Sequence, residues 1–360
     1  MRICFRVDAS YQMGTGHVIR CLTLAQALRD HGAECRFICR GHEGNLIELI
    51  CGRGFEVDVL PNGNKSGQMV DSGLFHAAWL GADWATDAQQ TWDLLQGEPV
   101  DWLIVDHYAL DYRWESALRP RCHRILVIDD IADRRHDCDE LLDQNYNSSA
   151  DSYHHLVPGH CNPMIGPCFA LLDSAYAARR TERRERTGKI LRVLIYFGGG
   201  NATDDLAGTA LQAFVCPELA DVYLDIVLGA GYAYRASLET KASQRGRVTL
   251  HSRLPHLADL MAAADLAIGA GGTTTWERCC MGLPSLVISV AENQRPICEA
   301  LSREGLIWYC GHSDAVSESS LREEILYLRA HPKVLLELGS AGMQLVDGEG
   351  TVRVVEVILG

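Results

Sequence analysis

The chain has fewer basic than acidic residues. Its 360 residues include 47 Asp or Glu and 33 Lys or Arg, which gives a formal net charge of −14. Nucleic acids are held by clustered Lys and Arg side chains, so this acidic balance argues against a nucleic-acid partner. It does not exclude a small anionic ligand, because a glycine-rich loop before a helix can hold a phosphate group without net positive charge.

The sequence also lacks the usual signs of a membrane or secreted protein. No run of 18 apolar residues occurs, and the N-terminus has no basic region followed by an apolar core. The 14 cysteines are scattered and form no C-x-x-C pair. This spacing favours reduced, buried thiols over disulfides, with zinc binding as the lesser alternative. We therefore expect a cytoplasmic protein with no membrane partner.

Apolar strands and amphipathic helices alternate in two blocks. The pattern predicts an α/β protein made of two doubly wound, Rossmann-like domains that face each other across a cleft. Between the blocks lies a dense charge run, ARRTERRERTGK, at 178–189. We interpret it as a solvated linker or an exposed helix end that marks the domain boundary. The predicted boundaries are therefore 1–178 for the first domain, 179–189 for the linker and 190–360 for the second domain.

A histidine lies where the first strand, a glycine turn and the first helix meet. The strand Ile3–Val7 leads through Gly14 and Gly16 to His17, and an apolar helical pattern covers Val18–Arg29. Such turns, at the carboxyl edge of a parallel sheet, are where open α/β folds bind ligands. The positive end of the helix dipole favours a neutral imidazole, which can accept a proton. His17 is thus a candidate base, with a structural or capping role as the alternative.

A second strand end in this half carries three polar or aromatic residues. The predicted strand Trp102–Val105 is followed directly by Asp106, His107 and Tyr108. Because the carboxyl ends of parallel strands meet at one edge of a sheet, these side chains are expected near His17. We favour a functional role for Asp106. His107 remains open between a substrate contact and packing behind Tyr108.

Aspartates close two further strands. Asp8 follows the first strand, and Asp129 and Asp130 follow the strand predicted at Arg124–Ile128. Each could contact a ligand, or could cap a helix or hold a loop. For Asp129 and Asp130 the pattern does not decide between these roles.

The second block contains two strand–glycine–helix turns, at Gly198–Gly200 and Gly269–Gly272. Both can bring main-chain amides and a helix N-terminus close to a phosphate. Neither is a P-loop or a G-x-G-x-x-G motif, so they favour a mononucleotide diphosphate over a dinucleotide cofactor. Glu277, early in the helix after the second turn, could accept hydrogen bonds from a ribose diol or could be a solvated carboxylate.

The second turn, followed by Gly-Leu-Pro and a strand, resembles the nucleotide-binding half of GT-B enzymes such as the MurG-type glycosyltransferases. A wider resemblance, over nearly the whole chain, is to the PseG family of UDP-2,4-diacetamido-2,4,6-trideoxy-β-L-altropyranose hydrolases of pseudaminic acid synthesis. It is carried by RVDASYQMGTGHVIRCLTLA, the Asp106-His107-Tyr108 strand end, the Asp129-Asp130 pair, FGGGN, and GGTTTWERCCMGLPSLVISVAENQ. The family commonly has Gly-Gly-x-Asp where this chain has Gly199-Gly200-Asn201-Ala202.

The resemblance implies that His17 deprotonates a water that attacks the anomeric carbon with inversion and expels UDP. It implies no cofactor and no metal. An inverting MurG-like transferase and a non-enzymatic nucleotide-sugar sensor are the alternatives. The implied substrate-binding residues are Asp8, Gly14, Gly16, Arg20, Asp106, His107, Tyr108 and Asn293. The implied nucleotide-binding residues are Gly198, Gly199, Gly200, Gly271, Gly272, Thr273 and Glu277.

Overall fold

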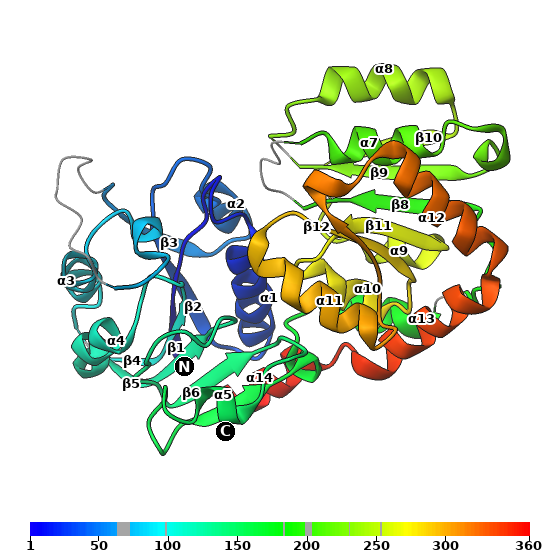
Figure 1. Ribbon diagram of the computed structural model, residues 1–360. Coiled ribbons are helices and arrows are strands. Elements are labelled where there is room, and N and C mark those ends of the chain that lie inside the picture. The colour runs from blue at the N-terminus through cyan, green and yellow to red at the C-terminus, as the bar shows by residue number, and fades with distance from the viewer. Residues whose placement is uncertain (63–72, 98, 183, 199–203, 230, 253) are drawn as a thin grey trace. The chain divides into compact units, whose positions relative to one another are not determined.

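The computed structural model describes residues 1–360 except 63–72, 98, 183, 199–203, 230 and 253 (Figure 1). The chain divides into two compact units. Unit 1 comprises residues 1–171 and 350–360, and unit 2 comprises residues 172–349. Each unit is a parallel sheet flanked by helices, which confirms the predicted class of two doubly wound α/β domains. Throughout the described part of the chain, no helix combines the length and apolarity that crossing a membrane requires.

The described residues of unit 1 form a seven-stranded sheet in the order β3-β2-β1-β4-β5-β6-β7. Its strands all pair in parallel, and the chain reverses its direction of travel between β1 and β4. The strands are β1 (Arg2–Val7), β2 (Glu34–Arg40), β3 (Glu56–Leu60), β4 (Val100–Asp106), β5 (Cys122–Ile128), β6 (Glu140–Asp143) and β7 (Asn162–Ile165). The helices are α1 (Gly16–Asp30), α2 (Ile47–Gly52), η1 (Ala77–Leu80), α3 (Trp84–Leu94), α4 (Tyr112–Leu118), η2 (Arg119–Arg121), α5 (Ala150–Tyr153), η3 (Pro167–Phe169) and α14 (Gly350–Leu359).

Unit 2 repeats this plan with six strands in its described part, ordered β10-β9-β8-β11-β12-β13, so its reversal falls between β8 and β11. The strands are β8 (Arg192–Tyr196), β9 (Tyr223–Leu228), β10 (Val248–Ser252), β11 (Leu266–Ala270), β12 (Ser285–Ser289) and β13 (Trp308–His312). The helices are α6 (Ser174–Glu182), α7 (Leu206–Ala213), η4 (Pro217–Leu219), α8 (Arg235–Arg245), α9 (Ala258–Ala263), α10 (Thr274–Cys280), η5 (Glu292–Gln294), α11 (Arg295–Arg303), η6 (Ser313–Ala315), α12 (Glu318–Ala330) and α13 (Pro332–Leu345).

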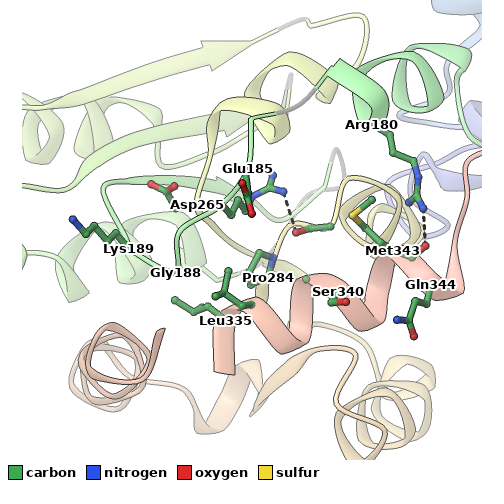
Figure 2. Close-up of a pocket in the computed structure, with 14 residues that line it drawn as sticks. Arg180, Glu185, Gly188, Lys189, Asp265, Pro284, Leu335, Ser340, Met343 and Gln344 are labelled. Carbon is green, nitrogen blue, oxygen red and sulfur yellow. Dashed lines mark hydrogen bonds between the residues drawn. The ribbon is translucent and has the colours of Figure 1, made fainter. Parts of the chain in front are cut away.

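Most described residues of the charge run at 179–189 are exposed, and its first residues end helix α6, but two of its arginines are bonded to unit 2. Arg180 donates to the main-chain carbonyls of Cys280, Met343 and Val346. Arg186 donates to four further carbonyls of unit 2, those of Met261, Ala264, Met281 and Gly282. These arginines border a cavity of about 460 Å³ (Figure 2). The segment is therefore part of unit 2, because guanidinium groups satisfy carbonyls left free at helix ends, which a count of charges does not reveal.

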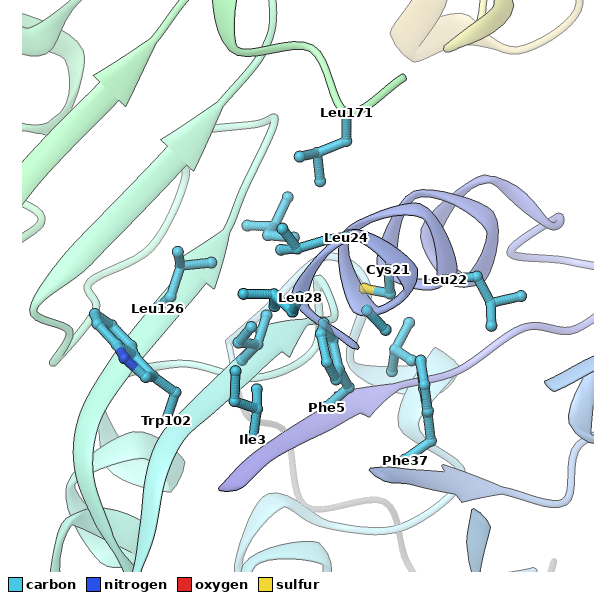
Figure 3. Close-up of a cluster of buried hydrophobic side chains, with 14 of the residues drawn as sticks. Ile3, Phe5, Cys21, Leu22, Leu24, Leu28, Phe37, Trp102, Leu126 and Leu171 are labelled. Atoms are coloured by element: carbon cyan, nitrogen blue, oxygen red, sulfur yellow. The ribbon is translucent and has the colours of Figure 1, made fainter. Parts of the chain in front are cut away.

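The last helix, α14, belongs to unit 1 and not to the second domain as predicted. Ile358 is buried in the same apolar cluster as Phe5 of β1 and Leu28 of α1. Figure 3 labels Phe5, Leu28 and other residues of this cluster. The Trp102 indole also donates to the Ile358 carbonyl over 3.0 Å. The apolar period predicted the helix correctly, but it contains no information about which sheet the helix covers.

We predict that Ile358→Ala lowers the free energy of unfolding of unit 1 by about 2–5 kcal/mol, because it leaves a cavity under α1. Amide hydrogen exchange should become faster in β1 and α1 and stay unchanged in unit 2. Val352→Ala is the matched control, since Val352 is 48% exposed on the same helix. Faster exchange in unit 2 instead would contradict the assignment of α14.

Candidate active site in unit 1 and nucleotide turn in unit 2

The strand order of unit 1 brings the predicted base and its partner together. β1 and β4 are neighbours, and Val7 is paired with Asp106 at their carboxyl ends. The turn after β1 is closed by a hydrogen bond from the Gly14 amide to the Ser10 carbonyl, with Gly14 at a φ of 76°. That positive φ favours glycine. α1 then begins at Gly16, so its second residue, His17, lies at the reversal point where doubly wound folds bind ligands.

The imidazole of His17 is oriented by a carboxylate. Its Nδ1 lies 2.6 Å from Asp106 Oδ1, and the residue is 9% exposed. An ionised carboxylate can only accept hydrogen bonds, so Nδ1 must carry a proton. In the neutral ring the lone pair is then on Nε2, for which no described residue is a hydrogen-bond partner. His17 can therefore act as a base through Nε2, which lies on the side of the ring away from Asp106.

Asp106 is kept ionised by Arg20, the fifth residue of α1. Burial opposes the charge on Asp106, but Arg20 and then His17 overcome this and lower the pKa of the carboxyl far below its usual value. Arg20 Nε donates to Oδ2 over 2.6 Å and Nη2 donates to Oδ1 over 2.7 Å. Such a two-point contact fixes the plane of the carboxylate, and through it the plane of the imidazole.

Asp130 and Tyr108 join the hydrogen-bonded group of His17, Asp106 and Arg20, and we call these five residues the His17 cluster. Arg20 Nη1 donates to Asp130 Oδ2 over 2.5 Å, and the Tyr108 hydroxyl donates to the same oxygen over 2.8 Å. The Tyr108 ring meets His17 edge to face, with ring centroids 4.7 Å apart. Asp130 is thus part of the His17 cluster. Asp129 instead holds its own loop, because it accepts from the Ala132 amide and pairs with a neighbouring arginine.

Asp8 and His107 lie behind the cluster, which corrects the prediction that they contact substrate. Asp8 is 1% exposed, and its Oδ1 accepts from Arg6 and from the Arg40 amide. His107 is 3% exposed, accepts the Ala109 amide at Nδ1, and directs Nε2 toward Asp8 Oδ2 at 3.3 Å. Burial lowers the pKa of His107, so its ring is neutral. Both residues support the sheet edge from inside.

A buried ion network that the sequence analysis missed holds helix α3 to this sheet. Asp87 of α3 accepts from Arg6 of β1, from Arg40 of β2 and from the Trp114 indole. All three charged side chains are fully buried. The available signal was an arginine inside an otherwise apolar strand, because a buried cation requires a buried anion.

The glycines of the second turn in unit 2 have two different roles. A side chain at Gly269 would collide with the Tyr196 carbonyl, and one at Gly271 would collide with Cys298 Sγ. Close packing alone therefore explains these two glycines. Gly272 is more open, because a Cβ atom placed there would approach only the Gln294 side-chain amide nitrogen, at 3.9 Å. The sequence analysis overlooked Gln294, whose Oε1 accepts from the Val290 amide and so fixes it beside the turn.

The other predicted nucleotide residues are only partly placed. Gly198 follows β8 with a φ of 96°, whereas Gly199 and Gly200 lie outside the described residues. Thr273 and Asn293 are both exposed, Thr273 at the start of α10 and Asn293 in η5. Their side chains are accessible to a ligand. In the part of the chain that is described, no three His, Cys, Asp or Glu side chains gather as a metal ion would require.

A buried arginine that the sequence analysis missed supports the second turn. Arg278 is 2% exposed and donates to the Ala270 carbonyl over 2.8 Å, to the Thr275 hydroxyl over 2.9 Å and to the Thr274 hydroxyl over 3.3 Å. All three acceptors are uncharged oxygens, and burial lowers the pKa of the guanidinium. The turn therefore has a positive charge beneath it that no carboxylate of the described residues neutralises through a hydrogen bond, which favours an anionic ligand.

Glu277 is a partly buried acid, and one of its carboxyl oxygens is not hydrogen-bonded to any described residue. Its Oε2 is buried and has no hydrogen-bond partner within the described ranges. Burial raises the pKa of Glu277 to about 7, and the Tyr176 hydroxyl and Arg278 only partly counter this. The carboxyl therefore changes charge near neutral pH, and it has capacity for a ligand donor.

Comparisons with known proteins agree with this architecture. No protein-family model matches the chain. The crystal structure of MurG from Acinetobacter baumannii superposes with a TM-score of 0.65 and 16% identity, covering 99% of each chain. The protein therefore has the GT-B fold.

Two curated relatives are similar in sequence. The chain is 24% identical over 85% of its length to the UDP-2,4-diacetamido-2,4,6-trideoxy-β-L-altropyranose hydrolase of Campylobacter jejuni, of which the match covers 97%. It is also 24% identical over 56% of its length to the spore coat polysaccharide biosynthesis protein SpsG of Bacillus subtilis. The chain spans 59% of that relative's length. The resemblance to the altropyranose hydrolase found in the motifs thus extends over most of the chain.

We predict that ionisation of Glu277 lowers the free energy of unfolding of the protein. The unfolded carboxyl loses its proton near pH 4.5 and the folded one near pH 7, so the wild-type protein loses stability as pH rises through that window. Relative to Glu277→Gln, the loss should reach about 3 kcal/mol and stay constant above pH 7. Urea unfolding at pH 4.5 to 8 measures it, with Glu337→Gln as the exposed control. Parallel pH profiles for wild type and Glu277→Gln would show that burial does not perturb this acid.

Proposed function

We propose that this protein hydrolyses a UDP-linked sugar, releasing UDP and the free sugar. The specific substrate proposed is UDP-2,4-diacetamido-2,4,6-trideoxy-β-L-altropyranose, which the Campylobacter jejuni relative hydrolyses according to its name. We further propose that this reaction is a step of pseudaminic acid synthesis. One observation carries the proposal. His17 is bonded to Asp106 through Nδ1, which leaves Nε2 as an oriented base at the ligand-binding edge of unit 1.

The base acts on water. His17 Nε2 accepts a proton as the water oxygen bonds to the anomeric carbon, and the bond from that carbon to the diphosphate oxygen breaks on the opposite side. The anomeric configuration is therefore inverted. The imidazolium formed in this step is stabilised by Asp106, which Arg20 holds ionised and in plane. A positioned base of this kind contributes about a hundred- to ten-thousand-fold to the rate.

The nucleotide turn of unit 2 receives the leaving group. The diphosphate binds at Gly272 and Thr273, above the buried charge of Arg278, which favours the negative charge that develops on UDP. Glu277 accepts hydrogen bonds from the ribose hydroxyls with its unpartnered oxygen. Gly198 and Asn293 add contacts to the phosphate or sugar. The proposal assigns the base to unit 1 and the leaving-group contacts to unit 2.

Release of UDP in water alone tests the reaction. Purified protein is incubated with UDP-2,4-diacetamido-2,4,6-trideoxy-β-L-altropyranose without any acceptor, and UDP and the anomeric configuration of the sugar are followed by NMR. The proposal expects stoichiometric UDP and inverted free sugar. Release that occurs only with an added sugar or lipid acceptor would contradict hydrolysis and support the inverting transferase that the MurG-like fold also allows.

We predict that His17→Asn lowers turnover at least about a hundredfold with little change in UDP affinity, because the base acts after binding. Asp106→Asn should also lower turnover by at least about a hundredfold, since the tautomer is no longer fixed. The double variant should be no slower than the worse single variant. Steady-state kinetics and calorimetry with UDP measure these effects.

His31→Asn is the control for this series. His31 is exposed at the opposite end of the same helix, where its Nδ1 is 2.8 Å from the Ala27 carbonyl. Its substitution should leave turnover unchanged. Wild-type turnover in His17→Asn would remove His17 from the mechanism.

A further inference from the structure

A row of aromatic rings extends from the catalytic histidine. Tyr108 packs its ring edge to face with His17, and Trp79 lies nearly parallel to Tyr108, with centroids 5.9 Å apart at 29°. His76 contacts both Trp79 and Tyr108, at 4.3 Å and 5.4 Å. Phe75 meets His76 edge to face at 4.9 Å. We call Phe75, His76, Trp79 and Tyr108 the aromatic row.

The aromatic row becomes more exposed with distance from His17. Tyr108 is 8% exposed, His76 and Trp79 are half-buried, and Phe75 is 88% exposed. A soluble protein rarely presents several aromatic rings together to water unless the surface receives a ligand or partner. Ligand sites typically combine such apolar walls with a few fixed polar groups. Here the fixed polar group is the imidazole at the inner end of the row.

The position of Trp79 is set by its neighbours in the chain. Trp79 belongs to η1, whose next residue, Leu80, is 2% exposed in the apolar cluster beneath. Gly81 then ends η1 at a φ of 69°, and a side chain there would collide with His42. The indole is therefore held in place by a buried anchor on its C-terminal side. A preorganised ring loses little entropy when it binds a ligand.

The chemistry of the aromatic row selects the kind of ligand. At its inner end, Arg20, Asp130 and Tyr108 bond to one another, and Asp130 Oδ1 is buried without a partner among the described residues. Burial lowers the pKa of His76, so this ring too is uncharged at neutral pH. The wall next to the base therefore offers mainly aromatic faces, because the free oxygen of Asp130 is buried. It suits a sugar in which hydroxyl groups have been replaced by methyl and acetamido groups.

We propose that Trp79, supported by Tyr108 and His76, packs against the apolar face of the sugar and selects 6-deoxy, N-acetylated sugars over hydroxyl-rich ones. The inference rests on the proposed function, because it places a UDP-linked sugar beside His17. Contact with an indole face buries the C6 methyl or an acetamido methyl without requiring a hydrogen-bond partner. Trp79 is thus a specificity residue and takes no part in proton transfer.

Binding measured in the His17→Asn protein separates this contact from catalysis. The probes are UDP, UDP-N-acetylglucosamine and UDP-2,4-diacetamido-2,4,6-trideoxy-β-L-altropyranose, each titrated by calorimetry. Trp79→Ala should weaken the altropyranose nucleotide about ten- to a hundredfold and UDP less than about twofold, which corresponds to loss of one buried aromatic contact. UDP-N-acetylglucosamine should be affected less, and Trp79→Phe should retain most of the affinity.

Trp92→Ala is the matched control. Trp92 is a half-buried tryptophan of α3 in the same unit, and its ring packs under Arg121, 4.0 Å away. It should leave all three affinities unchanged. If Trp92→Ala weakened binding of the altropyranose nucleotide as much as Trp79→Ala, the effect would come from lower stability of unit 1. This result would overturn the inference.

Two outcomes distinguish the inference from the proposed function. If the wild-type protein hydrolyses the altropyranose nucleotide but Trp79→Ala binds it as tightly as the parent, the specificity role is wrong and the function stands. If the wild-type protein releases no UDP but Trp79→Ala selectively weakens the sugar nucleotide, the aromatic row is a sugar site and hydrolysis is wrong. Equal affinity of the parent for UDP and for its sugar conjugate would also overturn the inference.

Discussion

The site of unit 1 depends on one buried carboxylate, that of Asp106. It is bonded to His17 on one side and to Arg20 on the other, and both partners belong to the first two turns of α1. A buried charge without such partners would be strongly unfavourable, so the carboxylate and the helix fix each other. Because Arg20 keeps Asp106 ionised, the imidazole has one proton position on its inner nitrogen and a free lone pair on the outer one.

The two units use the same sheet topology for opposite electrostatic purposes. In unit 1 the reversal point holds a buried anion, Asp106, which in the proposed reaction stabilises the positive charge on His17. In unit 2 the corresponding turn lies over a buried cation, Arg278, which in the proposed reaction favours the negative leaving group. Glu277 adds an acid that ionises near neutral pH. The proposed hydrolysis places positive charge on His17 and negative charge on the leaving group, and these two buried ions each favour one of those charges.

Much of the fold was predictable because its signals are local. Apolar periods gave most strands and helices, and the turn at Gly14 and His17 was evident from its spacing. Long-range facts were not predictable. The buried position of Asp8 depends on which strands are neighbours, and the place of α14 depends on which sheet has an uncovered face. Likewise, Gly271 suggested a phosphate contact, whereas its tight packing against Cys298 explains it without a ligand.

The tautomer of His17 tests the account most directly. In protein labelled with ¹⁵N in its histidines, heteronuclear NMR reports which nitrogen of the neutral ring carries the proton. The account predicts that Nδ1 of His17 is protonated and Nε2 is not, and that Asp106→Asn abolishes this preference. A proton on Nε2 in the wild-type protein would contradict the account, because no oriented base would then face the substrate.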